Sequence, residues 1–426
     1  MTTLELGLSF LLGQSTLSIV VVFWYTLIFE FPRYILPFLV VGLVMRSREE
    51  APPAAAETEP RFRPSVSIIL VGHNEERALE ACVRSLHEQS LTDFEIVIAS
   101  DGSTDRMCAV ARDLVRRGLA TRVLATDLRG GKPSGINLAS TFVTGDIIVN
   151  VDCDCSFDRY AIERLVEPFA DPRVGAVCGD IAPRNSEASV IAQFQEIEYL
   201  QSISVGKRIA NAIDQVVCAS GAFSAFRRQA LEDIGGFEAG GGEDLDTTIR
   251  LRRKGWRVVF APEAVCYTDV PETLYQYIRQ RLRWDRDSIW IRFRKHARLM
   301  SPLSPAFRPS EAFHQWDFAL FNVAAAFAFP VYLAWLFAQF GSFAIAILIA
   351  MQIGLMLVEA LILAVSTWCT GRRVFLRNLP FLPGYSLFMT YVMRLVRLYA
   401  YIDEWAFSGS HRDNYTPLKV RLQRPW

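Results

Sequence analysis

Acidic residues follow apolar segments at several points along the chain, and the clearest case is Asp152 and Asp154, directly after Ile147–Val151. Because side chains alternate along an extended strand, two carboxylates two residues apart lie on the same side and can share one cation. Carboxylate oxygens suit Mg2+ or Mn2+, which would bridge to substrate phosphates. The same spacing recurs at Asp244 and Asp246 and also arises by chance. The position directly after a strand is therefore what favours a metal site.

A second acidic group lies in a glycine-rich segment. Glu243 and Asp244 follow Gly240–Gly242 and precede a basic helix predicted over residues 247–254. Carboxylates at this position often only cap the free N–H groups of a helix. The glycines also allow a substrate to approach closely, so one carboxylate could act as a catalytic base. Both interpretations can hold, since Glu243, Asp244 and Asp246 cannot all cap one helix.

Two basic groups could bind an anion. Lys132 follows Gly130 and Gly131, so the backbone and an ammonium group could both approach a phosphate, although a solvated loop lysine has the same sequence. The cluster Gln280-Arg281-Leu282-Arg283-Trp284 combines an arginine for a diphosphate with an aromatic face for a sugar ring. A tryptophan beside a membrane segment can also simply anchor an interfacial helix.

The segments that must position these residues alternate between strand and helix. Four apolar runs have the character of buried strands: residues 66–71, 94–99, 121–125 and 146–151. Residues 76–90 and 104–117 have helical character. Such alternation indicates an α/β fold with a mainly parallel sheet, in which ligands bind at the carboxyl ends of the strands. The acidic groups fall at those ends.

Long uncharged stretches indicate an integral membrane protein. Residues 8–29 and 34–45 carry no charge, and between Asp317 and Arg372 the only ionisable carboxylate is Glu359. That last length is sufficient for two crossings at about 20 residues each. The formal net charge of zero argues against a nucleic-acid partner. The eight cysteines are scattered along the chain, which favours free thiols in a reducing compartment.

Two spans are expected near residues 316–340 and 343–368, joined by a tight turn at Gly341-Ser342. The second expected span is followed by three basic residues, Arg372, Arg373 and Arg377. By the positive-inside rule they indicate a cytoplasmic loop. Residues 379–401 are apolar but contain Arg394 and Arg397. Two interpretations of this segment therefore stay open: a transmembrane span or a helix that lies in the membrane interface.

The chain is therefore expected to contain six parts. They are an N-terminal membrane segment (1–50), a linker (51–64), an α/β domain (65–270), amphipathic interface helices (271–312), membrane-embedded helices (313–401) and a tail (402–426).

Taken in order, Asp101, Asp152-x-Asp154, Glu243-Asp244 and Gln280-x-x-Arg283-Trp284 resemble the motifs of the family 2 processive membrane glycosyltransferases. These include the cellulose, chitin, hyaluronan and poly-N-acetylglucosamine synthases, and the likeness covers residues 65–300. The resemblance implies a GT-A fold in the cytoplasm of a multi-pass protein of the plasma (inner) membrane. It also implies a UDP-sugar donor with Mg2+ or Mn2+, and a growing β-linked polysaccharide as acceptor, extruded across the membrane.

The resemblance also assigns donor-site residues. Asp101 would contact the uridine, with Asn74 and Glu75 nearby, although Gly72-His73-Asn74 lacks the aromatic residue usual in the family. The metal on the diphosphate would be held by Asp152 and Asp154. The remaining donor-binding side chains implied are Lys132, Gln280, Arg281 and Arg283.

At the acceptor side, Asp244 would be the general base with Glu243 beside it. Ser220 and Gly221 would line the acceptor end, and Trp284 would stack on the acceptor sugar. One base suffices for direct inversion, whereas a hydrolase would need a second carboxyl group as acid.

Two other functions stay open from the sequence. A non-processive enzyme that adds one sugar to a membrane lipid, as the ceramide glucosyltransferases do, would share the same acidic series and would differ in product size. A transporter with a nucleotide-binding domain would release no UDP from a UDP-sugar. The sequence leaves open the sugar, the linkage, any export partner, the oligomeric state and the number of N-terminal spans.

Overall fold

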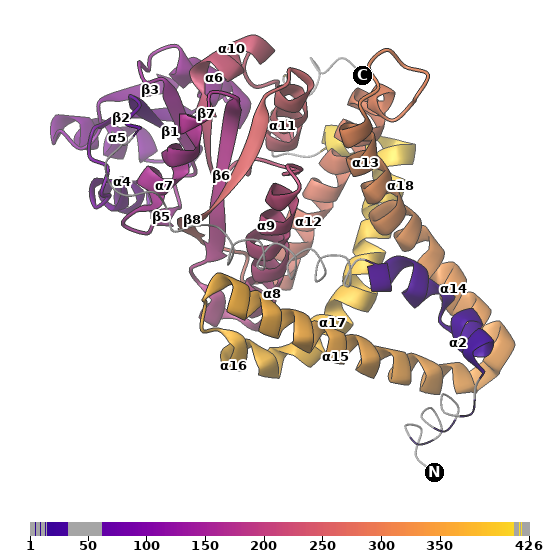
Figure 1. Cartoon of the computed structure of the whole chain (residues 1–426). Helices are drawn as coiled ribbons and strands as arrows, with labels where there is room; N and C mark the ends of the chain where they lie inside the picture. The colour runs from indigo at the N-terminus through magenta and orange to yellow at the C-terminus, as the bar shows by residue number, and fades with distance from the viewer. Residues whose placement is uncertain are drawn as a thin grey trace, which may run out of the picture.

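The computed structural model describes residues 15–32 and 62–412, together with the isolated residues Glu5, Ser9, Gly13, Pro417 and Lys419. Most of the predicted linker, the uncharged stretch 34–45 and about half of the predicted tail lie outside the described residues. Within the described part, an α/β domain lies beside a set of long helices (Figure 1).

The α/β domain is built on an eight-stranded sheet with the order β3-β2-β1-β4-β7-β6-β8-β5. Its strands are β1 Val66–Gly72, β2 Phe94–Asp101, β3 Arg122–Thr126, β4 Ile147–Val151, β5 Ser156–Phe157, β6 Val174–Pro183, β7 Phe223–Arg227 and β8 Arg257–Thr268. The first four predicted strands are confirmed within one or two residues, and they pair with one another in parallel. The sheet is mixed beyond β4, because β7 runs antiparallel to both β4 and β6.

The central strand shows why the sheet is covered on both faces. Every residue of β1 is buried. Ile68 and Leu70 belong to a core with side chains of helices α4, α5 and α7, whereas Ile69 and Val71 belong to a core with side chains of α6, α10 and α11. The period-two alternation of side chains thus produces two apolar faces from one uninterrupted apolar run. These helices are α4 Leu79–His87, α5 Met107–Arg116, α6 Lys132–Ser140, α7 Ala161–Val166, α10 Arg228–Ile234 and α11 Glu243–Arg253.

The strand order reverses between β1 and β4. The chain leaves β1 towards β2 on one side, and β4 adds to the other side of β1. In an open α/β sheet, such a reversal leaves a crevice at the carboxyl ends of the two strands. The segments that begin at His73 and Asp152 start at this crevice.

The longest apolar helical stretch is Pro309–Thr370, the one candidate within the described residues that is long and apolar enough to cross a membrane. It comprises α13 Pro309–Phe318, the π-helical turn η7 Ala319–Ala324, α14 Ala325–Phe340 and α15 Ala344–Thr370. The chain folds back between α14 and α15 (Figure 1), at Gly341 with φ 55°. The predicted turn is confirmed there.

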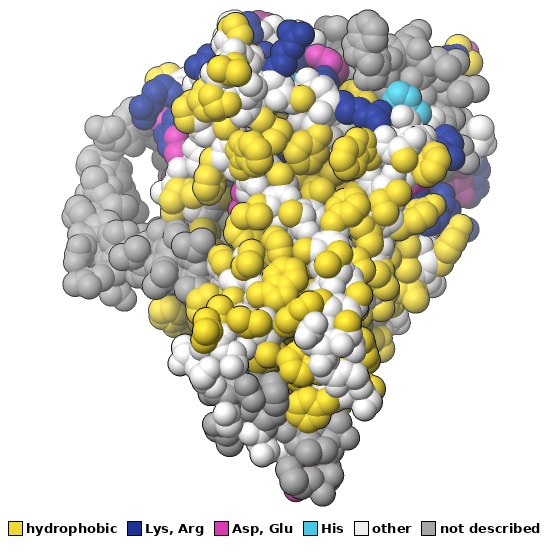
Figure 2. Space-filling model, turned by 90° about the vertical axis from the view of Figure 1, so that its right-hand side faces the viewer, with side chains coloured by type: hydrophobic (Ala, Val, Ile, Leu, Met, Phe, Trp, Pro, Cys, Tyr) yellow, Lys and Arg dark blue, Asp and Glu magenta, His cyan; other side chains and the backbone are white. Residues whose placement is uncertain are grey.

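Apolar side chains along this stretch point outward. Trp316, Val331 and Leu357 are 59%, 62% and 69% exposed. Figure 2 shows hydrophobic side chains covering the middle of this face of the molecule, with Lys and Arg side chains towards one end. Such a surface is far more apolar than that of a typical soluble domain.

The C-terminal region returns to the α/β domain. The arginine after α15, Arg372, pairs with buried Asp180 of β6 at 2.9 Å. Arg377 pairs with Glu196 of α8 (Val190–Tyr199). The end of α15 therefore lies against the α/β domain.

Residues 379–401, left open by the sequence, form a mostly helical path: η9 Leu379–Phe381, α17 Leu382–Leu387, η10 Phe388–Met393 and the start of α18 Arg394–Phe407. Helix α18 packs along α12, Leu274–Ile289. Arg394 pairs with buried Glu30, which follows the N-terminal helix α2 Thr16–Val22. This pair joins the two ends of the described chain.

Candidate active site

A chain of contacts crosses the carboxyl ends of the central strands. Lys132, the first residue of α6, donates from Nζ to Asp152 Oδ1 and, at 2.7 Å, to the carbonyl oxygen of Gly221. The amide of Gly221 in turn donates to Asp244 Oδ2 at 3.2 Å. Four predicted site residues from four separate segments therefore meet at one place.

Gly221 lies at the centre of this group. A Cβ added there would lie 3.4 Å from Lys132 Nζ, 3.6 Å from Glu243 Oε1 and 3.7 Å from Asp244 Oδ2. One ammonium and two carboxylates thus surround a position without a side chain. The same carbonyl oxygen of Gly221 also accepts from Asn150 Nδ2 at 2.7 Å, and Asn150 lies on β4. The peptide that carries the site is therefore fixed from the sheet.

Helix α11 begins earlier than the sequence predicts, at Glu243 rather than at residue 247. Its N-cap is Gly242, with φ 69°, and no side chain caps it. The N-cap position thus belongs to a glycine in a left-handed conformation, and not to one of the three carboxylates. Asp244 Oδ1 accepts instead from the amide of Leu245 at 2.8 Å.

Glu243 has an unusual electrostatic environment. Burial, and next the neighbouring Asp244, raise the pKa of Glu243 to about 7, while Lys132 and Arg283 act in the opposite direction. The influence of Arg283 places α12, which carries it, within electrostatic range of the α11 terminus. A carboxyl group that titrates near neutral pH is suited to proton transfer.

Asp246, the third acid of this turn, belongs to a different group. It is buried and accepts from His296 Nε2 at 2.8 Å and from Lys295 Nζ at 2.7 Å. These contacts fix the start of α11 against the segment after α12. Asp246 thus has a stabilising role, and the second Asp-x-Asp spacing is not a metal pair.

The other acidic pair, Asp152 and Asp154, follows β4. Burial and the charge of Asp152 raise the pKa of Asp154. Burial, then Asp154 and Asp152, raise the pKa of Glu75 to about 7. Crowded carboxylates that repel one another are a suitable environment for a divalent cation.

Within the described residues, no three His, Cys, Asp or Glu side chains come together closely enough to hold a metal ion by themselves. Mg2+ needs fewer, since one or two carboxylates with substrate phosphates and water complete its shell. Asp152 and Asp154 therefore fit a metal that is held jointly with a substrate.

Asp101 and Asn74 hold loops at the crevice. Asp101, 6% exposed, accepts from the amides of Gly130 and Gly131 at 2.6 and 2.7 Å. Asn74, with φ 63°, accepts through Oδ1 from the amide of Thr104 at 2.8 Å. Both side chains thus organise backbone that leads into the site, and direct contact with a nucleotide stays a prediction for both.

On α12 the four predicted residues differ in environment. Gln280 has a buried Oε1 without a hydrogen-bond partner among the described residues, so it is suited to receive a ligand donor. Trp284 is 40% exposed. Arg281 is 5% exposed and pairs with Glu198 of α8 at 2.6 Å. The predicted donor contact of Arg281 does not fit this buried pairing.

Two side chains at the site escaped the sequence reasoning. Lys207 of α9 (Gly206–Ala212) donates to Ser220 Oγ, and Glu198 holds Arg281. Both residues lie in helices after the fourth strand and do not directly follow a strand, so their positions in the sequence give no sign that they lie at the site.

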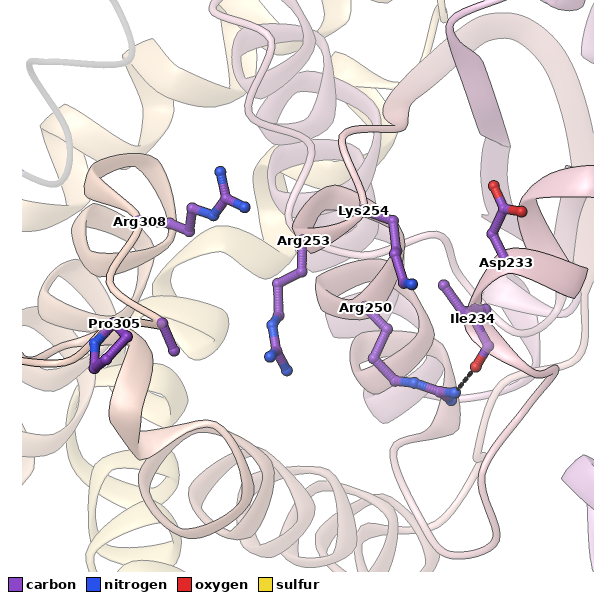
Figure 3. A pocket seen from close by; sticks show the side chains of 8 residues that line it. Asp233, Ile234, Arg250, Arg253, Lys254, Pro305 and Arg308 are labelled. Carbon is purple, nitrogen blue, oxygen red and sulfur yellow. Dashed lines mark hydrogen bonds between the residues drawn. The ribbon is translucent and has the colours of Figure 1, made fainter.

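A separate cleft of about 480 Å3 lies near the other end of α11 (Figure 3). It is lined mainly by basic side chains: Arg250, Arg253, Lys254 and Arg308, with Asp233, Ile234, Pro305 and Ala306. Arg250 donates to the carbonyl oxygen of Ile234, as drawn in Figure 3. Basic residues in the last turn of a helix stabilise its dipole, which accounts for part of this charge. None of the predicted site residues lines the cleft.

Comparison with known proteins gives a consistent result. Residues 64–286 match the family described as glycosyltransferase like family 2. An N-acetylglucosaminyltransferase of Rhizobium meliloti (strain 1021) is 29% identical over 252 residues, which is 56% of this chain and 59% of that protein. A poly-beta-1,6-N-acetyl-D-glucosamine synthase of Staphylococcus aureus (strain COL) is 29% identical over 221 residues, 51% of this chain and 53% of the relative. The matches thus span a little over half the length of these relatives.

Among solved structures, a mannosyltransferase of Pyrobaculum calidifontis, PcManGT in complex with GDP-Man and Mn2+, superposes with a TM-score of 0.58. It is 22% identical, and the match covers 92% of this chain and 99% of that chain. The likeness confirms the predicted α/β GT-A fold class together with the long helices.

Proposed function

The chain belongs to glycosyltransferase family 2, and we propose that it is a membrane-embedded, inverting transferase that extends a β-linked polysaccharide from a UDP-sugar. The observation that carries the proposal is the contact chain Asp152–Lys132–Gly221–Asp244, with Glu243 beside it. It brings a cation for a leaving diphosphate and a carboxylate for an acceptor hydroxyl close to one glycine.

The donor side must stabilise the charge that develops on the leaving diphosphate. Lys132 and Arg283 are the cations near the carboxylate pair of α11, since both lower the pKa of Glu243. Fixed positive charges in a partly buried site stabilise such a leaving group without reorganisation. Asp152 and Asp154 would hold a Mg2+ or Mn2+ ion, which would add Lewis-acid stabilisation of the same charge.

The acceptor side needs one base. We assign it to Asp244, whose Oδ2 lies within hydrogen-bond distance of the Gly221 amide and faces the centre of the site. An acceptor hydroxyl that displaces this hydrogen bond could transfer its proton to Asp244 while its oxygen attacks the anomeric carbon. Direct attack inverts that carbon, so an α-linked donor gives a β-linked product. Glu243, with its pKa near neutrality, tunes the charge of the pair.

The membrane part supports a long or lipid-bound acceptor. Trp284 is exposed on α12, and α12 packs against α18 next to the apolar stretch Pro309–Thr370. Arg372 pairs with Asp180 of the α/β domain, so this basic loop and the α/β domain share one side of the membrane. By the positive-inside rule that side is the cytoplasm, where UDP-sugars are available. Localisation in the plasma membrane is part of the proposal.

The test uses the full chain, purified in detergent and returned to lipid vesicles. UDP-N-acetylglucosamine is the first donor, because two relatives are named for N-acetylglucosamine transfer; UDP-glucose and GDP-mannose follow, each with Mn2+ or Mg2+. A ladder of products by mass analysis supports chain extension. A product with a single sugar added to a lipid would instead support the alternative, transfer of one sugar to a membrane lipid. Failure to release nucleotide from any donor overturns the proposal.

A further inference from the structure

The buried pair Arg281–Glu198 lies directly behind Trp284. Arg281 Nη2 and the hydroxyl of Tyr277 donate to the same oxygen of Glu198, at 2.6 and 3.0 Å. The guanidinium carbon of Arg281 lies 4.2 Å from the centroid of the Trp284 ring and 4.7 Å from that of Tyr277. A carboxylate from α8 thus fixes a cation that lies over an aromatic ring of α12.

The geometry is unsuited to donor binding. The side chains of Arg281 and Glu198 are only 6% and 15% exposed, and the guanidinium is enclosed by three aromatic rings, including Tyr199 at 5.9 Å. Trp284 in contrast is 40% exposed. The cation therefore covers part of the indole while the rest of the ring faces outward.

We propose that Glu198 is a positioning residue for the acceptor: it holds Arg281 against Trp284, so the indole presents one fixed face to the terminal sugar of the acceptor. This inference rests on the proposed function. Two physical effects support it. A guanidinium over an indole is an attractive contact that becomes stronger when it is desolvated, and a carboxylate with two donors fixes where that guanidinium lies.

An aromatic ring with one orientation loses less entropy when a sugar binds to it than a ring that samples several. Loss of the Glu198 charge should therefore weaken acceptor binding and leave the donor side unchanged. A purely stabilising pair would behave differently, because its loss would reduce both steps together with the melting temperature.

The experiment measures nucleotide release by the full chain in vesicles, with UDP-N-acetylglucosamine as donor and a soluble β-linked N-acetylglucosamine oligosaccharide as acceptor. Glu198→Gln should raise the acceptor KM about tenfold and leave the donor KM and the acceptor-independent release of UDP within about twofold. In the Trp284→Ala background, the same substitution should change the acceptor KM by less than about twofold.

Two further variants keep the test decisive. Tyr277→Phe removes one hydrogen bond to Glu198 and keeps the charges, so it should shift the acceptor KM in the same direction by about threefold, including where Glu198→Gln folds poorly. Glu311→Gln is the matched control, because Arg252–Glu311 is another buried arginine–carboxylate pair, with exposures of 10% and 2%. It should lower the melting temperature without changing the acceptor KM.

Three results would overturn the inference: an equal rise of the donor KM, additive effects of Glu198→Gln and Trp284→Ala, or an unchanged acceptor KM in Tyr277→Phe. Failure of the wild-type protein to release UDP in the same assay is a different outcome, since it contradicts the proposed function itself.

Discussion

Replacement of Asp101 by asparagine tests how the donor side is organised. The carboxylate of Asp101 is nearly inaccessible, and its two oxygens accept from the consecutive amides of Gly130 and Gly131, at 2.6 and 2.7 Å. The next residue is Lys132, which reaches Asp152 and Gly221. The structure therefore gives Asp101 the role of holding the loop that presents Lys132.

The size of the effect follows from these two hydrogen bonds. An asparagine can keep one of them, while its amide group would face the other N–H. A hydrogen bond to a charged group contributes about 1.5–3 kcal/mol. Loss of one corresponds to roughly 13- to 160-fold in the equilibrium between the ordered and the opened loop. UDP affinity should fall by the same factor, if binding requires the ordered loop.

Two measurements on Asp101→Asn check this reasoning: amide hydrogen exchange at Gly130 and Gly131, and UDP affinity by titration calorimetry. Both should change by a similar factor. Asp105→Asn is the matched control, because Asp105 also bridges two amides, those of Glu76 and Met107, both at 3.0 Å. It should leave exchange at the two glycines unchanged. Lost UDP affinity with unaltered exchange would refute loop anchoring and favour direct contact of Asp101 with the uridine.

Three further predictions concern the reacting groups. Asp244→Asn should bind UDP within about twofold of wild type and transfer sugar about 10²- to 10⁴-fold more slowly, and normal turnover would remove Asp244 as the base. The pKa of Glu243 lies at about 7, above its ordinary value of 4.5. Between these pH values the unfolded chain binds fewer protons than the folded protein, so the free energy of unfolding should fall as pH rises from about 4.5 to about 7. Denaturant midpoints across that range should be flatter in Glu243→Gln, and an equal slope would contradict the assignment. Chelation of divalent metal should abolish UDP release, and added Mn2+ or Mg2+ should restore it. Asp154→Asn should raise the Mn2+ concentration that gives the half-maximal rate. An unchanged metal dependence in this variant would exclude Asp154 as a ligand.

The first half of the sheet was predictable because its strands are continuous apolar runs. Burial on both faces makes β1 and β4 apolar at nearly every position. The first four strands are also parallel to one another, so their carboxyl ends lie at the same edge of the sheet. The acids after β1, β2 and β4 could be placed at one edge by topology alone. Their convergence with Lys132 follows from the same rule, since Lys132 lies in the connection between β3 and β4.

The second half was hidden because its pairing is not sequential. Strand β7 lies between β4 and β6 and runs antiparallel to both, so the rule for consecutive parallel strands does not place it. The burial of Arg281 was hidden because its partner Glu198 precedes it by 83 residues. Two arginines in one motif, Arg281 and Arg283, give no sign of which one is buried, because that depends on which face of α12 meets α8.

Helix α12 joins the candidate active site to helix α18 through contacts on several of its sides. Arg281 binds α8 of the α/β domain, while Arg286 pairs with Asp403 of α18 at 2.9 Å. At the active-site end, a Cβ added to Gly241 would clash with the carboxylate of Asp287, so α12 lies directly against the glycines before Glu243. A displacement of α12, which carries Trp284, would therefore also move α18 and the glycines before Glu243. In the proposed chain extension, such coupling would join release of the acceptor at Trp284 to re-exposure of Asp244, the assigned base, in one motion.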